Sequence, residues 1–114
     1  MLTAFAILLV VHGLIHLLGA AKGFGWAELP QLTQPISPAL GGLWLVSALL
    51  FLATAVSLVV WPRGWWVIGA CAVAVSTVAI VPSWTDAKIG ALANVMVCVG
   101  VAVRFWSRGP SPVL

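Results

Sequence analysis

The chain has 114 residues, of which 63% are hydrophobic and only 6% are charged, and its net charge at neutral pH is +3. A soluble domain of this size needs far more polar side chains to cover its core. The composition therefore excludes an ordinary water-soluble domain and indicates a chain that lies in a lipid bilayer. The basic excess does not indicate nucleic acid, because basic side chains at membrane edges interact with lipid phosphates.

The first apolar run covers residues 2–21 and contains no fixed charge. Its twenty residues would form a helix about 30 Å long, the thickness of the hydrocarbon core. A signal peptide is the alternative, since small residues end the run at Gly19, Ala20 and Ala21. No basic residue precedes the run, however, and it is long for the apolar part of a signal peptide. We therefore predict a membrane-spanning helix.

Three more apolar runs follow the first. Ser37 and Pro38 form a favourable helix start, an N-cap residue followed by proline at the first helical position. The residues from 61 to 64 form a tight turn, which predicts an antiparallel hairpin. The predicted fold is an all-α, up-and-down, four-helix transmembrane bundle forming a single domain. Its helices cover residues 2–21, 38–61, 64–81 and 89–106, with a 16-residue outer loop over 22–37 and a shorter loop over 82–88.

The charged and aromatic residues suggest an orientation. With four spans, Arg63, Arg104 and Arg108 lie on the side of the termini, and Lys22 and Lys88 lie on the other. The excess of basic residues predicts that both termini are cytoplasmic. Tryptophans are expected in belts at both interfaces. The outer belt would contain Trp26, Trp44 and Trp84, and the inner belt Trp61, Trp65, Trp66 and Trp106.

His12 and His16 are the main chemical feature, because residues four apart share one face of a helix. Imidazoles facing lipid would leave polar atoms without partners, so we predict that this face points into the bundle. Asn94 is expected at the same depth as His16. The alternatives are structural hydrogen bonds, a quinone, lipid or proton site, a bis-histidine haem and a metal site. A metal site needs more than two ligands, and the histidines cannot bind both faces of one haem from one helix face.

The loops provide the other candidates. Asp86 can stabilise the start of the last helix, or it can pair with His16 and orient the imidazole. Glu28 lies in an aromatic segment that can cover the bundle at the interface. The candidate ligand-binding residues are therefore His12, His16, Asn94, Asp86, Glu28 and Trp84, and the metal candidates are His12 and His16.

Residues 12–19, 28–37 and 83–88 resemble a family of small bacterial membrane proteins of unknown function. The resemblance implies four transmembrane helices in the bacterial cytoplasmic membrane and transfers no catalytic residue. The chain is also similar in size and number of spans to DoxX-like proteins, which implies a quinone or redox connection.

No motif indicates an enzyme or identifies a cofactor. The leading prediction is a non-enzymatic accessory or lipid-interacting membrane subunit. The alternatives are a quinone, haem or metal-binding redox or proton-relay module that uses His12 and His16, and an oligomeric transporter component. The expected partners are membrane lipids and either a larger membrane protein or further copies of the chain, with no nucleic acid.

Overall fold

The computed structural model describes residues 2–30 and 32–108, and all regular secondary structure within them is helical. The predicted all-α class is therefore confirmed. A loop over residues 24–37 joins the first two helices, and a 3₁₀ helix joins the last two without a break. The elements are α1 (Leu2–Gly23), α2 (Pro38–Val60), α3 (Trp65–Ile80), η1 (Val81–Ser83) and α4 (Trp84–Arg108).

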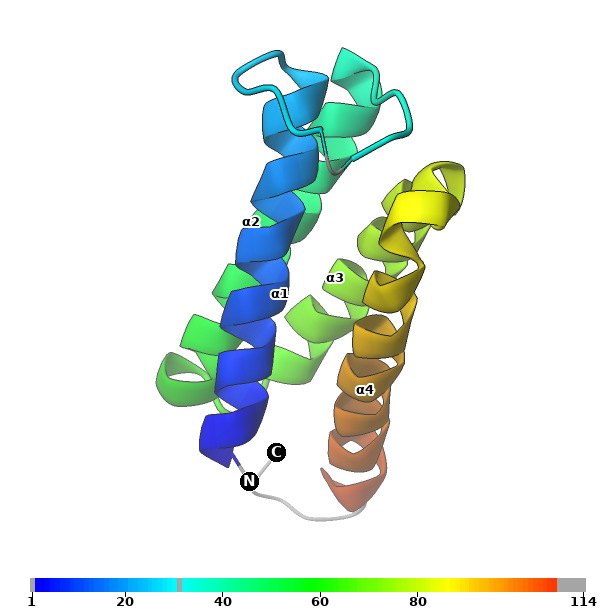
Figure 1. Ribbon diagram of the computed structural model, residues 1–114. Helices are drawn as coiled ribbons and strands as arrows, with labels where there is room; N and C mark the ends of the chain where they lie inside the picture. The colour runs from blue at the N-terminus through cyan, green and yellow to red at the C-terminus, as the bar shows by residue number, and fades with distance from the viewer. Residues whose placement is uncertain (1, 31, 109–114) are drawn as a thin grey trace.

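In the described part of the chain, three continuous helical stretches are long and apolar enough to cross a membrane: Leu2–Gly23, Pro38–Val60 and Trp65–Ser107. The third stretch has 43 residues and would measure about 65 Å as one straight helix. The longest dimension of the molecule is only 49 Å, so this stretch folds back, and Figure 1 shows the reversal around η1. Because α3 alone has 16 residues, length and composition establish three such stretches and not the four predicted.

The helices run alternately up and down along one long axis (Figure 1). The start of α1, the end of α4 and the turn between α2 and α3 lie at one end. The loop over residues 24–37 and η1 lie at the opposite end, which we call the loop end. Helix α1 packs mainly against α2, and α3 packs against both α2 and α4. Helices α1 and α4 make few contacts with each other, so the bundle is least closed between them.

Local sequence explains where the helices begin. The Ser37 hydroxyl accepts a hydrogen bond from the Leu40 amide at 3.1 Å, and Pro38 opens α2, which confirms the predicted start. Helix α4 begins at Trp84, five residues before the predicted position. Pro82 lies in the first turn of η1, where a missing amide costs little, and Asp86 lies in the first turn of α4. The predicted loop over 82–88 is therefore mostly helical.

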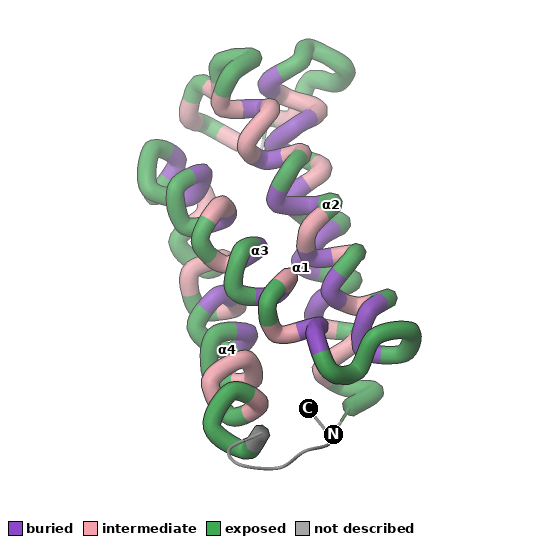
Figure 2. Tube along the Cα trace, turned by 180° about the vertical axis from the view of Figure 1, so that it is seen from behind, coloured by how far each residue is buried: buried purple, intermediate pink, exposed green. Residues whose placement is uncertain are grey.

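Helix α1 continues to Gly23, so the loop after it has 14 residues instead of 16. The buried positions face the interior of the bundle (Figure 2). One buried cluster contains Leu9, Phe51, Leu58, Trp65, Ala72 and Val97. A second cluster, nearer the loop end, contains Ala20, Trp44, Ala79 and Ile80.

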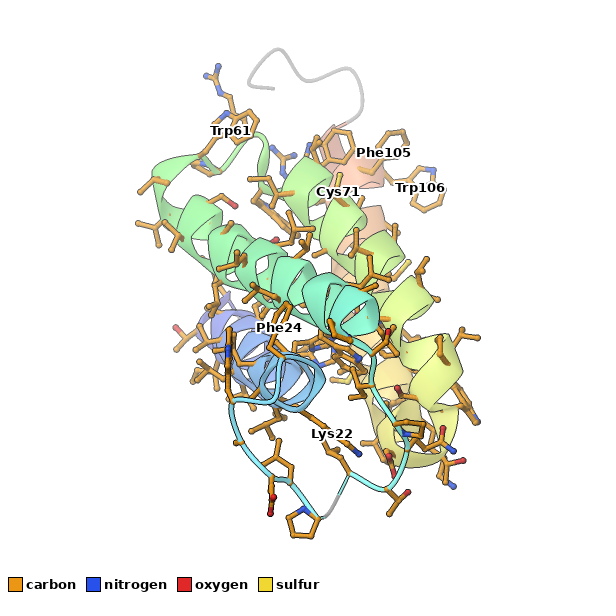
Figure 3. All side chains as sticks on the ribbon, turned by 90° about the horizontal axis from the view of Figure 1, so that it is seen from above. Lys22, Phe24, Trp61, Cys71, Phe105 and Trp106 are labelled. Atoms are coloured by element: carbon orange, nitrogen blue, oxygen red, sulfur yellow. The ribbon has the colours of Figure 1, made fainter. Side chains whose placement is uncertain are left out.

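The tryptophans only partly follow the predicted belts. Trp44 is buried in the second cluster, and Trp65 is buried in the first. These two rings therefore fill space between helices and are not part of an exposed belt, while their predicted depth near the two interfaces stays a prediction. The side chains of Trp26, Trp84, Trp61 and Trp106 are exposed. Figure 3 shows Trp61 and Trp106 pointing away from the bundle.

Candidate functional site

His12 and His16 lie on the inner face of α1, where they are 4% and 1% exposed. The prediction that both point into the bundle is confirmed. Their ring centroids are 4.5 Å apart, as expected for residues one helical turn apart. Phe51 of α2 packs against both rings, with centroid distances of 4.6 and 5.2 Å, and Trp44 lies 4.9 Å from His16. Aromatic side chains of α2 therefore fix both imidazoles.

A closed set of hydrogen bonds joins these histidines to α3 and α4. The Asn94 Oδ1 atom can only accept, so His12 Nε2–H donates to it at 2.7 Å. The backbone carbonyl of His12 can only accept, so His16 Nδ1–H donates to it at 2.8 Å. His16 Nε2 then accepts a hydrogen bond from the Ser76 hydroxyl at 2.7 Å. Asn94 Nδ2 donates to Ser76 Oγ at 3.0 Å and closes the set. We call His12, His16, Ser76 and Asn94 the polar network.

The polar network decides how the histidines can be used. Both nitrogens of His16 and the Nε2 atom of His12 are already engaged in hydrogen bonds. Metal or haem ligation through these atoms would require the network to break. No group of three or more His, Cys, Asp or Glu residues that could hold a metal lies within residues 2–30 and 32–108. His16 reaches Asn94 only through Ser76, whereas His12 contacts Asn94 directly.

Charged residues attach the loop to the helices at the loop end. The Asp86 carboxylate accepts hydrogen bonds from the Thr33 hydroxyl at 2.6 Å and from the backbone amide of Gln34 at 2.7 Å. These two bonds connect the loop to the first turn of α4. Lys22 donates to the carbonyl of Leu32 and, at 2.6 Å, to the carbonyl of Gln34. Figure 3 shows Lys22 extending toward the loop.

One interpretation of the sequence paired Asp86 with His16, and the structure shows no such pairing. The Asp86 oxygens bind the loop, and the His16 nitrogens bind His12 and Ser76. Glu28 is exposed on the loop and lines neither of the two main cavities. Trp84 lines a cavity of about 240 Å³ between α3 and α4, and Asn94 reaches the same cavity. Of the predicted set, hydrogen bonds among the described residues thus join only His12, His16 and Asn94.

A larger cavity of about 280 Å³ lies between α1 and α4 beneath the loop, and we call it the side cavity. Ile15 and Leu18 of α1 and Ile89 of α4 line it while remaining exposed, so the cavity reaches the outside between these helices. Leu32 and Ile36 bring the loop onto its wall. The remaining lining residues are His12, His16, Gly19, Trp44, Ile80, Ser83, Asp86, Ala87, Gly90 and Ala93.

Two buried side chains among those that line the side cavity carry a polar group with no hydrogen-bond partner among the described residues. These groups are the Trp44 indole Nε1–H and the Ser83 hydroxyl, in side chains that are 5% and 2% exposed. Buried polar atoms in folded proteins nearly always have a partner, and a bound water or another molecule supplies it where the protein does not. Sequence reasoning missed Trp44, Ser83 and Ser76. Only the position of Ser76, four residues after Ala72, indicated that it faces a neighbouring helix.

Comparison of the chain with protein-family models, with curated proteins and with solved structures finds no match. The functional argument therefore depends on the polar network and the side cavity.

Proposed function

We propose that the chain is a small, non-enzymatic integral membrane protein that holds a lipid-soluble molecule in the side cavity. In this proposal all four α-helices cross the bacterial cytoplasmic membrane, with both termini in the cytoplasm. The 49 Å length of the bundle is close to the roughly 40–45 Å of a bilayer with its headgroups. Helix α3 and η1 together span residues 65–83, and these 19 residues extend about 28 Å.

The position of the side cavity is the observation that carries the proposal. Its opening lies between exposed apolar side chains, and the loop that covers it is held by Lys22 and Asp86. In a bilayer such an opening faces acyl chains, because α1 and α4 present apolar residues on both sides of it. A molecule dissolved in the membrane could enter without crossing water. This supports the lipid-interacting role over the other predicted roles.

The remainder of the interior favours binding over transport. Beyond His12, toward the termini, the described core is the apolar cluster that includes Leu9, Phe51 and Val97. The buried hydroxyls of Thr54 and Ser57 bond to carbonyls of their own helix. The polar network therefore has no polar continuation through the described half of the bundle that ends at the termini. A transported ion or proton would need such a path.

A pair of substitutions on α4 tests the proposal. Ala93 lines the side cavity, whereas Leu92 points outward and is 61% exposed. We expect Ala93→Phe to fill the cavity and Leu92→Phe to leave it open. Native mass spectrometry of protein purified from its own membrane should find a lipid-soluble molecule on the wild type and on Leu92→Phe, and most of it lost from Ala93→Phe. Equal retention by both variants would contradict the proposal.

A further inference from the structure

The unused polar atoms of the side cavity indicate what it would recognise. His12 Nε2, both nitrogens of His16 and both oxygens of Asp86 are already paired within the protein. The Trp44 indole N–H and the Ser83 hydroxyl are buried and remain without partners among the described residues. An indole N–H can only donate, and a hydroxyl can donate or accept. A bound molecule that satisfies both must therefore present a hydrogen-bond acceptor.

We propose that the side cavity binds an uncharged, lipid-soluble molecule through a carbonyl oxygen that accepts hydrogen bonds from Trp44 and Ser83. This inference rests on the proposed function and adds the chemical class of the bound molecule. A carbonyl oxygen accepts hydrogen bonds and donates none, so it suits both an indole N–H and a hydroxyl. The apolar remainder of the molecule would leave between α1 and α4, where Ile15, Leu18 and Ile89 line the opening.

The walls argue against a charged ligand. Among the described residues, Asp86 is the one ionic side chain that lines the side cavity, and each of its oxygens already accepts a hydrogen bond from the loop. An anion would be repelled by this carboxylate, and a cation would have it as a single ionic partner that already holds the loop. Either charge would lose its hydration without compensation in an otherwise apolar cavity. The molecule is therefore expected to be neutral.

Water is the simplest alternative occupant. The volume of about 280 Å³ could hold roughly nine molecules at about 30 Å³ each. Ten of the 15 lining residues, however, are isoleucine, leucine, alanine or glycine, whose side chains offer water no hydrogen bonds. The opening between Ile15 and Ile89 would also face lipid and not water. A molecule with one polar end and an apolar body fits these walls better than a water cluster.

Two membrane molecules share this chemistry, namely a glycerolipid with an ester carbonyl and an isoprenoid quinone with a ring carbonyl. Binding to the full-length protein in detergent would be measured with matched probes. The first pair is dioleoylglycerol and dioleyl glycerol ether, which lacks the carbonyl groups. The second pair is a benzoquinone with a short isoprenoid tail and the dimethoxybenzene with the same tail. If the protein prefers the carbonyl compound in the first pair, the ligand is a glycerolipid, and if it does so in the second pair, the ligand is a quinone.

We expect the wild type to bind the carbonyl member of one pair about five- to thirtyfold more tightly, the effect of one or two net hydrogen bonds. Trp44→Phe retains an aromatic ring but removes the N–H, and Ser83→Ala removes the hydroxyl. Each should reduce the preference, whereas Trp106→Phe, at a side chain that is 75% exposed, should not. Thermal unfolding would check that each variant is folded. If Trp44→Phe is unstable, Ser83→Ala and the comparison of probes on the wild type still test whether the carbonyl group is recognised.

The outcomes separate this inference from the proposed function. If both members of each pair bind the wild type equally, and Ala93→Phe abolishes both, the cavity binds lipids and the carbonyl inference is wrong. If Ala93→Phe retains every probe, the cavity is not the binding site and the proposed function fails as well. If no probe binds and the purified protein contains only water in the side cavity, both are overturned.

Discussion

Asn94 has more hydrogen-bond partners than any other side chain of the polar network. Its Oδ1 accepts from His12, and its Nδ2 lies 3.0 Å from Ser76 Oγ and 3.3 Å from Thr77 Oγ1. Three helices therefore meet at one amide group. In a bilayer no water would replace these bonds if the amide were removed. The stability of the bundle should consequently depend on this residue more than its size suggests.

We predict that Asn94→Leu lowers the free energy of unfolding by about 1–3 kcal/mol, because the His12 N–H then has no acceptor. Denaturation in mixed micelles, followed by circular dichroism, would measure the change. Val95 is the control, since it is adjacent and 58% exposed. Val95→Leu should change the stability by less than about 0.5 kcal/mol. Equal stability of the two variants would show that the network contributes little.

Some of the site could be predicted from residue spacing, and some could not. The spacing of His12 and His16 and the cost of an unpaired imidazole were sufficient to predict their burial. The role of Ser76 depends on the rotation of α3, which a run of small and apolar residues does not determine. The pairing of Asp86 with Thr33 and Gln34 depends on the path of the loop backbone. Sequence spacing contains no information about that path.

Helices α1 and α2 lie close together at the loop end, where Gly23 faces Gly41. A Cβ atom on Gly23 would lie 2.6 Å from Gly41 Cα, which is closer than such atoms can approach. We predict that Gly23→Ala forces the two helices apart and lowers the free energy of unfolding by about 1–3 kcal/mol. The midpoint of thermal unfolding in detergent would report the loss.

Gly42 is the matched control for this substitution, because a Cβ atom there meets nothing within 4 Å. Gly42→Ala should leave the stability unchanged or raise it by about 0.5–1 kcal/mol, since alanine favours a helix. If Gly23→Ala were as stable as Gly42→Ala, the close approach would not be a constraint on packing.

Helix boundaries were predictable where side chains cap backbone groups and less so elsewhere. The start of α2 followed from Ser37 and Pro38, because the serine hydroxyl bonds to the Leu40 amide. The start of α4 was misplaced because Pro82 suggested a loop. Proline is compatible with the first turn of a helix, and here the chain turns through η1 and continues directly into α4.

At the scale of the whole molecule, cysteine labelling tests the proposed orientation. In a Cys71→Ala, Cys98→Ala background, Ala27→Cys places a thiol on the loop and Pro62→Cys places one in the turn between α2 and α3. Both positions are exposed. A membrane-impermeant maleimide should label Ala27→Cys in intact cells and Pro62→Cys only after permeabilisation. The reverse labelling pattern would show that the termini lie outside the cell, and that the distribution of basic residues had predicted the wrong orientation.

The position of the side cavity at the loop end has a consequence for the two leaflets of the membrane. The cavity lies beneath the loop, and the apolar cluster around Leu9 and Phe51 fills the bundle nearer the termini. In a membrane-embedded bundle, the opening between α1 and α4 would communicate with one monolayer only. The occupant would then depend on lipid asymmetry and flip-flop, and the same molecules confined to the opposite monolayer would remain out of reach.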